Sequence, residues 1–190
     1  MPPSITFSQN DILNAAFQLV RKKGVAELTA RKVAQMAGSS TAPVYSYYKS
    51  MDELRDAIFD KALNLLRAYI SRPYTETYFL NIAVGVCYFA RDEQHLFKAT
   101  FLTGKIAKKF VDEFFYELLE KLTLDPRFKE AERDVRLRVL HIMWNQVMGM
   151  SAMLVTGLWD DPSDANILEH LEDVGNILVG IAEKKSKMLI

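Results

Sequence analysis

The residues best suited to catalysis do not form a catalytic pattern in this 190-residue sequence. Cys87 is the only cysteine, and no two histidines are at the i,i+3 or i,i+4 spacing of a helical metal site. The sequence has no GxSxG motif, no P-loop and no GxGxxG motif. We therefore expect no enzymatic activity, no metal site and no cofactor.

A different chemistry is indicated by residues 28–48, LTARKVAQMAGSSTAPVYSYY. Leu28, Val33 and Ala34 have the spacing of one face of a short helix. Gly38 interrupts this pattern where a helix ends in a left-handed residue, and a second short helix then runs to Tyr47. Two short helices joined by such a turn predict a helix-turn-helix, whose second helix lies in the DNA major groove.

The expected second helix carries small polar and aromatic side chains and no charge. Small side chains allow a helix to approach base edges, and Ala, Pro or Thr can contact a thymine methyl. Pro43 is tolerated only in a first helical turn, which places the N-cap near Ser40. We expect the first turn to touch the bases, with Val44 and Tyr48 facing inward.

These residues resemble the DNA-binding domain of TetR-family (tetracycline-repressor-like) transcriptional regulators over residues 8–56. The resemblance is carried by Thr29-x-Arg31-Lys32-Val33-Ala34-x-x-Ala37-Gly38-Ser39-Ser40, Val44-Tyr45-x-Tyr47-Tyr48 and Ser50-x-x-Glu53-Leu54. The sequence departs from the family pattern at Ser39, Tyr48 and Met51. The family often has a phosphate-binding Lys in place of Met51, and Lys49 is the candidate to replace it.

Two cations stand in the first turn of the helix that follows Thr29, which is unfavourable for the helix dipole. This conflict indicates a use for Arg31, which could reach a guanine edge or a phosphate, while Thr29 could hold a phosphate. The resemblance implies the same roles. The expected base-reading residues are Arg31, Thr41, Ala42 and Pro43. The full expected DNA-binding set is Thr29, Arg31, Lys32, Ser40, Thr41, Ala42, Pro43, Tyr45, Ser46, Tyr47 and Lys49.

The charges are unevenly distributed although the net charge is zero. Residues 1–50 contain six basic and two acidic side chains, a net +4, which leaves −4 on the remainder. This distribution fits a DNA-binding head on a body that avoids DNA. The triplet Arg21-Lys22-Lys23 has two interpretations, a complement to a helix C-terminus or a set of phosphate contacts.

The sequence favours a cytoplasmic location. A single cysteine excludes an intramolecular disulfide, and residues 1–11 lack the features of a signal peptide. Residues 139–159 carry no charged side chain and are long enough to span a bilayer. Because this segment contains His141, Asn145 and Gln146, we interpret it as a buried helix at an oligomer interface.

The fold class is predicted to be all-α. An N-terminal three-helix helix-turn-helix domain, residues 1–52, is joined by a long helix to a helical ligand-binding and dimerisation domain, residues 53–190. Capping boxes at Ser8/Asp11 and Ser50/Glu53 start the first and the long helix. Helices are expected at residues 75–90, where the apolar pattern indicates a central helix, and at 92–103, 106–122, 130–156 and 163–187.

The last two helices are apolar beyond one face and contain small residues such as Gly149, Ser151 and Gly175. A two-fold four-helix bundle made from these helices of two protomers would bury that surplus. A homodimer would also suit a helix-turn-helix that reads a palindrome. The resemblance implies the same interface.

The expected body is rich in Phe, Tyr and Met, which suits an adaptable apolar cavity. The same residues at helical spacing also fit an ordinary core, and Asn81, His141, Asn145 and Gln146 could serve a ligand or the dimer. The candidate lining residues are Phe79, Ile82, Val86, Phe89, Phe110, Phe114, Met143, Trp144, Val147 and Met148.

The sequence thus predicts a ligand-responsive transcriptional regulator, a repressor that binds a palindromic double-stranded DNA operator as a dimer. A small apolar or aromatic effector would release it. The alternative is a helical interaction protein that has lost sequence-specific DNA binding. Met51 is the feature that favours this alternative, whereas Arg31, Tyr45 and Tyr47 argue against it.

Overall fold

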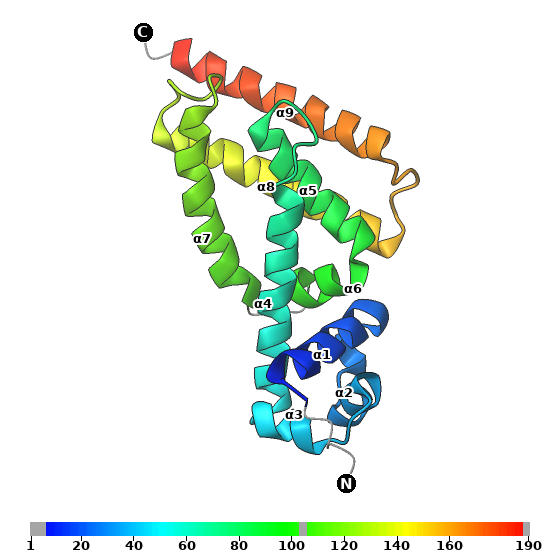
Figure 1. Ribbon diagram of the computed structural model, residues 1–190. Helices are drawn as coiled ribbons and strands as arrows, with labels where there is room; N and C mark the ends of the chain where they lie inside the picture. The colour runs from blue at the N-terminus through cyan, green and yellow to red at the C-terminus, as the bar shows by residue number, and fades with distance from the viewer. Residues whose placement is uncertain (1–6, 103–105, 188–190) are drawn as a thin grey trace. The chain divides into compact units, whose positions relative to one another are not determined.

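The computed structural model describes residues 7–102 and 106–187, and every regular element within them is helical (Figure 1). The predicted all-α class is therefore confirmed. The chain forms two compact units, which divide inside the long helix α4 (Met51–Ile70) after Leu65. Residues 93–102 belong to the first unit by their contacts, although residues 66–92 before them and 107–187 after them belong to the second.

The first unit contains the helix-turn-helix. Its elements in chain order are α1 (Gln9–Lys23), the 3₁₀ turn η1 (Val25–Glu27), α2 (Ala30–Ala37), α3 (Ala42–Tyr47), the first part of α4, α6 (Gln94–Phe97) and the π-helical turn η2 (Lys98–Leu102). Figure 1 shows α1, α2 and α3 clustered in the blue-to-cyan part of the chain. Ile12, Val20, Val33, Val44, Leu54 and Ile58 are buried and form the centre of this unit.

Local signals determine where the helices of the first unit begin and end. The backbone N–H of Ser8 donates to Asp11 Oδ2 (2.9 Å), and that of Asp11 donates to Ser8 Oγ (3.2 Å), which completes the predicted capping box. Thr29 Oγ1 caps α2 by accepting from the N–H of Lys32 (3.3 Å). Gly38 has φ +68°, the left-handed conformation that ends α2 at little steric cost.

An ion pair attaches α6 to α1 within the first unit. Arg21 Nε donates to Glu93 Oε2 (2.6 Å), and a second bond joins the same two side chains. The Glu93 side chain is only 3% exposed. Arg21, one of the three cations that the sequence left between two interpretations, is thus engaged by a buried carboxylate.

The second unit is built around α5 (Tyr78–Asp92). It also contains the end of α4, α7 (Ile106–Lys121), the 3₁₀ turn η3 (Leu122–Leu124), α8 (Arg133–Thr156) and α9 (Asp164–Lys187). Every residue from Phe79 to Ala90 is buried, and α5 packs against α8 and α9 (Figure 1). The expectation of a central helix is therefore confirmed.

Gly85 is required where α5 crosses the end of α4. A Cβ added at this position would lie 2.6 Å from Ile70 Cα and 2.8 Å from Tyr69 O. These are backbone atoms, which cannot move aside as a flexible side chain can.

None of the helices in the described part of the chain is long and apolar enough to cross a membrane.

Candidate nucleic-acid interface and ligand cavity

Helix α3 starts one residue later than the sequence predicted. Its N-cap is Thr41 rather than Ser40, and Pro43 is the second helical residue. Pro43 is compatible with either N-cap. It has no backbone N–H to donate, and N–H groups in the first turn of a helix have no acceptor within the helix in any case. The N-cap prediction is corrected by one position, while the expected helix end at Tyr47 is confirmed.

The two sides of α3 differ as predicted. Val44 and Tyr48 are buried against the first unit, whereas Tyr45 is 59% exposed. Thr41, Ala42 and Ser46 are also exposed, and Pro43 is half-buried. The exposed face of α3 is therefore uncharged and consists of small side chains and one tyrosine, while Val44 and Tyr48 anchor the helix in the core of the first unit.

Cations and hydroxyls from neighbouring segments surround this face. Arg31, Ser40 and Lys49 are exposed. Thr29 is exposed too, although its hydroxyl already accepts the N–H that caps α2. Lys32 forms an ion pair with Glu27, whose carboxyl pKa is lowered by the hydrogen bond to Lys32. Exposed pairs of this kind contribute little stability, so a phosphate can replace Glu27 at small cost.

Tyr47 and Lys49 have local contacts in this structure. The Tyr47 hydroxyl donates to the Phe7 carbonyl (2.8 Å), which holds the start of the described chain against α3. The backbone N–H of Lys49 donates to Glu53 Oε2 (2.7 Å), and that of Glu53 donates to Ser50 Oγ (3.1 Å). The second capping box is therefore altered, because the Glu53 carboxylate accepts from the backbone N–H of Lys49 rather than from that of Ser50. Phosphate contacts by these side chains stay predictions.

Most of the predicted ligand-lining residues meet at one small apolar space among α5, α7 and α8. Its volume is about 20 Å³, which is room for a single water-sized group. Seven of the ten predicted residues line it: Phe79, Ile82, Val86, Phe114, Met143, Trp144 and Val147. In this structure the expected cavity is therefore a nearly filled core.

The other three predicted residues do not line this space. Phe89 is fully buried and packs edge-on against Tyr69, with ring centroids 5.7 Å apart. Met148 is half-buried on α8, and the side chain of Phe110 lies outside the described residues. Asn81, considered as a ligand-orienting group, instead bonds to Thr75 through its amide nitrogen (2.9 Å) and its amide oxygen.

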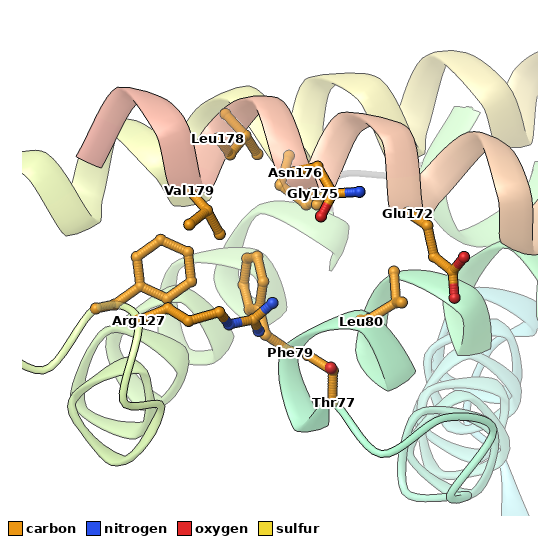
Figure 2. Close-up of a pocket in the computed structure, with 11 residues that line it drawn as sticks. Thr77, Phe79, Leu80, Arg127, Glu172, Gly175, Asn176, Leu178 and Val179 are labelled. Atoms are coloured by element: carbon orange, nitrogen blue, oxygen red, sulfur yellow. The ribbon is translucent and has the colours of Figure 1, made fainter. Parts of the chain in front are cut away.

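A larger cavity of about 640 Å³ adjoins the small apolar space, with which it shares Phe79 and Leu118. The described residues that line it are Glu76, Thr77, Tyr78, Phe79, Leu118, Lys121, Leu122, Asp125, Pro126 and Arg127. A second cavity, of about 290 Å³, lies between the start of α5 and α9 (Figure 2). Thr77, Phe79 and Arg127 line both of these cavities.

The sequence prediction included only Phe79 from the larger cavity. The remaining residues come from the segment before α5 and from the turn after α7, which the sequence marked merely as a loop at Asp125-Pro126. Two cations that border this turn, Lys121 and Arg127, were the available signal, but charged residues near a turn are common on any surface.

The two cations of the larger cavity are held in place by their neighbours. Asp125 accepts hydrogen bonds from the backbone N–H (3.0 Å) and Nε (2.9 Å) of Arg127. The hydrogen bond from the Arg127 side chain lowers the pKa of the Asp125 carboxyl. Lys121 Nζ bonds to Glu117 (2.5 Å), lies 5.5 Å from the Tyr78 ring centroid, and has a raised pKa because of the Glu117 hydrogen bond.

Comparison with known proteins identifies the helix-turn-helix. Residues 12–58 match the family model described as bacterial regulatory proteins, tetR family. The chain is a TetR-family transcriptional regulator. The expected resemblance is therefore confirmed, and no curated protein matches the sequence.

Solved structures of regulatory proteins share the fold. A TetR-like transcriptional regulator from Rhodococcus sp. RHA1 has a TM-score of 0.62 at 14% identity, covering 92% of this chain and 99% of its own. NalD, the secondary repressor of a multidrug efflux pump in Pseudomonas aeruginosa, has a TM-score of 0.52 at 17% identity, covering 87% and 94%. The fatty acid degradation regulator FadR from Bacillus halodurans has a TM-score of 0.55 at 14% identity, covering 93% and 97%.

TetR-family regulators bind DNA operators and act as dimers, and they are not enzymes. In this TetR-family chain, α8 and α9 have outward faces with large apolar side chains, including Met153 and Ile177, which is 64% exposed. A Cβ built at Gly149, Gly175 or Gly180 would meet no atom within 4 Å, so each glycine borders open space.

The described residues contain no group of acidic, His or Cys side chains that could hold a metal ion.

Proposed function

We propose that this chain is a ligand-responsive repressor that binds a palindromic operator as a homodimer and is released by a small effector. The observation that carries the proposal is the exposed, uncharged face of α3, which stands on a buried Val44 and Tyr48. An ordinary solvated face of a helix would be rich in charged residues. A face without charge, flanked by exposed cations, fits base edges between two rows of phosphates.

The proposed DNA contacts divide into two groups. Arg31, Thr41, Ala42 and Pro43 read bases, with Ser46 beside them on the exposed face. Thr29, Lys32, Ser40, Tyr45, Tyr47 and Lys49 contact phosphates and fix the register. The phosphate group supplies most of the salt dependence, whereas the base group supplies the sequence preference.

The dimer is proposed to form through α8 and α9. Four helices from two protomers would cover Met153 and Ile177, and the glycines at positions 149 and 175 would allow close approach of the backbones. A two-fold dimer places two copies of α3 on the half-sites of a palindrome. Ile177→Glu is expected to give monomers in analytical sedimentation and to weaken operator binding. Glu172→Gln changes an exposed residue five positions earlier on the same helix and should leave the dimer intact.

The effector is proposed to bind in the second unit, in the larger cavity with its apolar floor. It would bind most tightly to a conformation in which the two heads are wrongly spaced for successive major grooves, and thereby shift the population off the DNA. Linkage then requires that effector and operator weaken each other by the same factor. Equal effector affinity with and without operator DNA would contradict this mechanism.

The decisive experiment is a salt series of binding to DNA fragments taken from beside the gene for this chain. Tight binding to one fragment, with an affinity that falls steeply as salt rises, is the expected result. A fragment that contains only one half of the palindrome should bind much more weakly than the whole. Equal, weak binding to every fragment would contradict the proposal and favour a helical protein that has lost sequence-specific DNA binding.

A further inference from the structure

We infer that the effector is an amphipathic organic acid, whose carboxylate is bound by Arg127 and Lys121 and whose apolar body lies on Phe79 and Leu118. This inference rests on the proposed function, because it assigns a chemical class to the proposed effector. It follows from the division of the larger cavity into an apolar floor and a rim with two cations.

The floor of the cavity suits an apolar group. Phe79, Leu118 and Leu122 are all buried, and Tyr78 and Pro126 add apolar surface at the sides. A volume of about 640 Å³ lies in the range of cavities that bind small organic molecules. The body of the ligand therefore loses its contact with water in this cavity, which supplies most of its affinity.

The rim presents Arg127 in an orientation suited to a carboxylate. The bonds that Arg127 forms with described residues engage its Nε and Nη2, both with Asp125, whose side chain is only 12% exposed. One edge of the guanidinium is thereby fixed, and Nη1 remains for a ligand. Figure 2 shows the guanidinium beside Phe79, where the two larger cavities meet. A planar guanidinium held in this way binds carboxylates with directed hydrogen bonds.

Lys121 supplies the second positive charge at the rim. Its partner Glu117 is one helical turn earlier and 56% exposed, so the pair is a weak surface contact that a ligand carboxylate can replace. The Tyr78 ring positions the ammonium group over the cavity. The first turn of α5 borders the same space and carries no acidic residue, so the positive end of the helix dipole also favours an anion.

The acidic residues near these cavities do not favour a cationic ligand. Asp125 is occupied by Arg127, as described above. Glu76 and Glu172 are exposed to water and have no hydrogen bond to another described side chain that would hold them toward the cavity. A hydrated, unconstrained carboxylate binds a cation weakly, whereas the Arg127 guanidinium is held in place by Asp125.

The larger cavity borders the small apolar space, since Phe79 and Leu118 line both. Because that space holds only about 20 Å³, the apolar chain of a ligand is buried in the larger cavity itself, against Phe79, Leu118 and Leu122. Affinity should therefore rise with chain length, by about fourfold for each methylene that becomes buried.

Three ten-carbon probes test this inference by isothermal titration of the full chain below their micelle concentrations: sodium decanoate, decan-1-ol and decylammonium chloride. Decanoate should bind about tenfold more tightly than decanol, since a hydrogen bond to a charged group is the difference between them. Octanoate and then hexanoate should bind progressively more weakly. Equal affinity for decanol, tighter binding of decylammonium, or binding of none of the probes would overturn the inference.

Substitutions locate the site. Lys121→Gln and Arg127→Gln should each lower decanoate affinity several-fold and leave decanol affinity unchanged. Lys129→Gln is the matched control, because Lys129 is exposed on the same loop and lines neither cavity. Should Arg127→Gln unfold the loop by freeing Asp125, Lys121→Gln still tests the charge. An equal loss with Lys129→Gln would show a general charge effect and overturn the site.

The DNA measurement separates this inference from the proposed function. Decanoate that binds and also weakens operator binding supports both. Decanoate that binds at Arg127 and Lys121 without changing operator affinity supports the site and contradicts its role as the effector site. Operator release by decanol to the same extent as by decanoate supports the regulator and overturns the assignment of an acid.

Discussion

The two candidate sites of this chain are built in different ways. The exposed face of α3 comes from one six-residue helix, and its residues are within six positions of one another in sequence. The larger cavity is lined by residues 76–79 and 118–127, which about forty intervening residues separate along the chain. One site thus depends on local structure in the first unit, whereas the other depends on how the helices of the second unit pack.

This difference predicts that the two sites differ in their tolerance to substitution. A side chain on the exposed face of α3 projects into water, so its replacement should alter the proposed DNA contacts and little else. A residue near the cavity is surrounded by other helices, so its replacement also alters the packing that shapes the cavity. We therefore expect substitutions to separate stability from binding in the first unit and to couple them in the second.

The largest effect is expected from Gly85→Ala in the second unit. The added methyl group meets the backbone of Tyr69 and Ile70 at 2.6–2.8 Å, so α5 must move away from the end of α4. We expect a loss of about 3 kcal/mol in the free energy of unfolding, measured by urea denaturation. Gly180→Ala is the control, because a Cβ there meets nothing within 4 Å, and it should not lower the free energy of unfolding. Equal stability of both variants would contradict the close crossing.

In the first unit, Arg21→Gln tests the ion pair with Glu93. This pair joins residues far apart in the sequence, as the helix packing of the second unit does. It leaves the buried Glu93 carboxylate without its two hydrogen bonds. Because the Arg21 side chain is 43% exposed, water compensates in part, and we expect a loss of about 2 kcal/mol rather than the larger cost of a fully buried pair. Lys22→Gln, an exposed neighbour, should change the free energy of unfolding by less than about 0.5 kcal/mol. Comparable losses in both variants would show that the net charge of α1 matters more than the pair.

The local site could be predicted from the sequence because its signals are local. The Thr29 cap, the left-handed Gly38 and the inward-facing Val44 each depend on neighbours a few positions away. The N-cap of α3 was displaced by one residue, since Thr41 and Ser40 have similar capping ability and Pro43 fits both placements. The all-helical class followed from periodicity in the same way.

The cavity could not be predicted in the same way. Periodicity identified the apolar residues of α5, α7 and α8, but tight packing closed most of the space between them to about 20 Å³. The open space lies at the start of α5 and the end of α7, where Thr77, Lys121 and Arg127 line the same cavity. No local pattern indicates that these segments come together, because their contact depends on helix lengths and crossing angles.

Tyr45→Ala sharpens the comparison by altering binding without altering the fold. The ring is 59% exposed and supports no core residue, so the melting temperature should stay the same. Loss of its proposed phosphate contact should lower operator affinity about tenfold in a fluorescence anisotropy titration. Tyr116→Ala removes a tyrosine that is 69% exposed on α7 and should bind the operator as the wild type does. A matching loss in the Tyr116 variant would mean that α3 is not the reading element.

The smallest effects are expected where the two units use the same local device. Ser50 Oγ accepts from the N–H of Glu53 (3.1 Å) in the first unit, and Ser163 Oγ accepts from that of Asn166 (3.3 Å) in the second. Replacement of either serine by alanine removes one helix cap, and each should cost about 1 kcal/mol in the free energy of unfolding. Ser50→Asp and Ser163→Asp keep an acceptor in place and should retain most of the stability. A large difference between the two alanine variants in the free energy of unfolding would mean that helix caps depend on their tertiary surroundings. The contrast between a site set by local structure and one set by helix packing would then be contradicted.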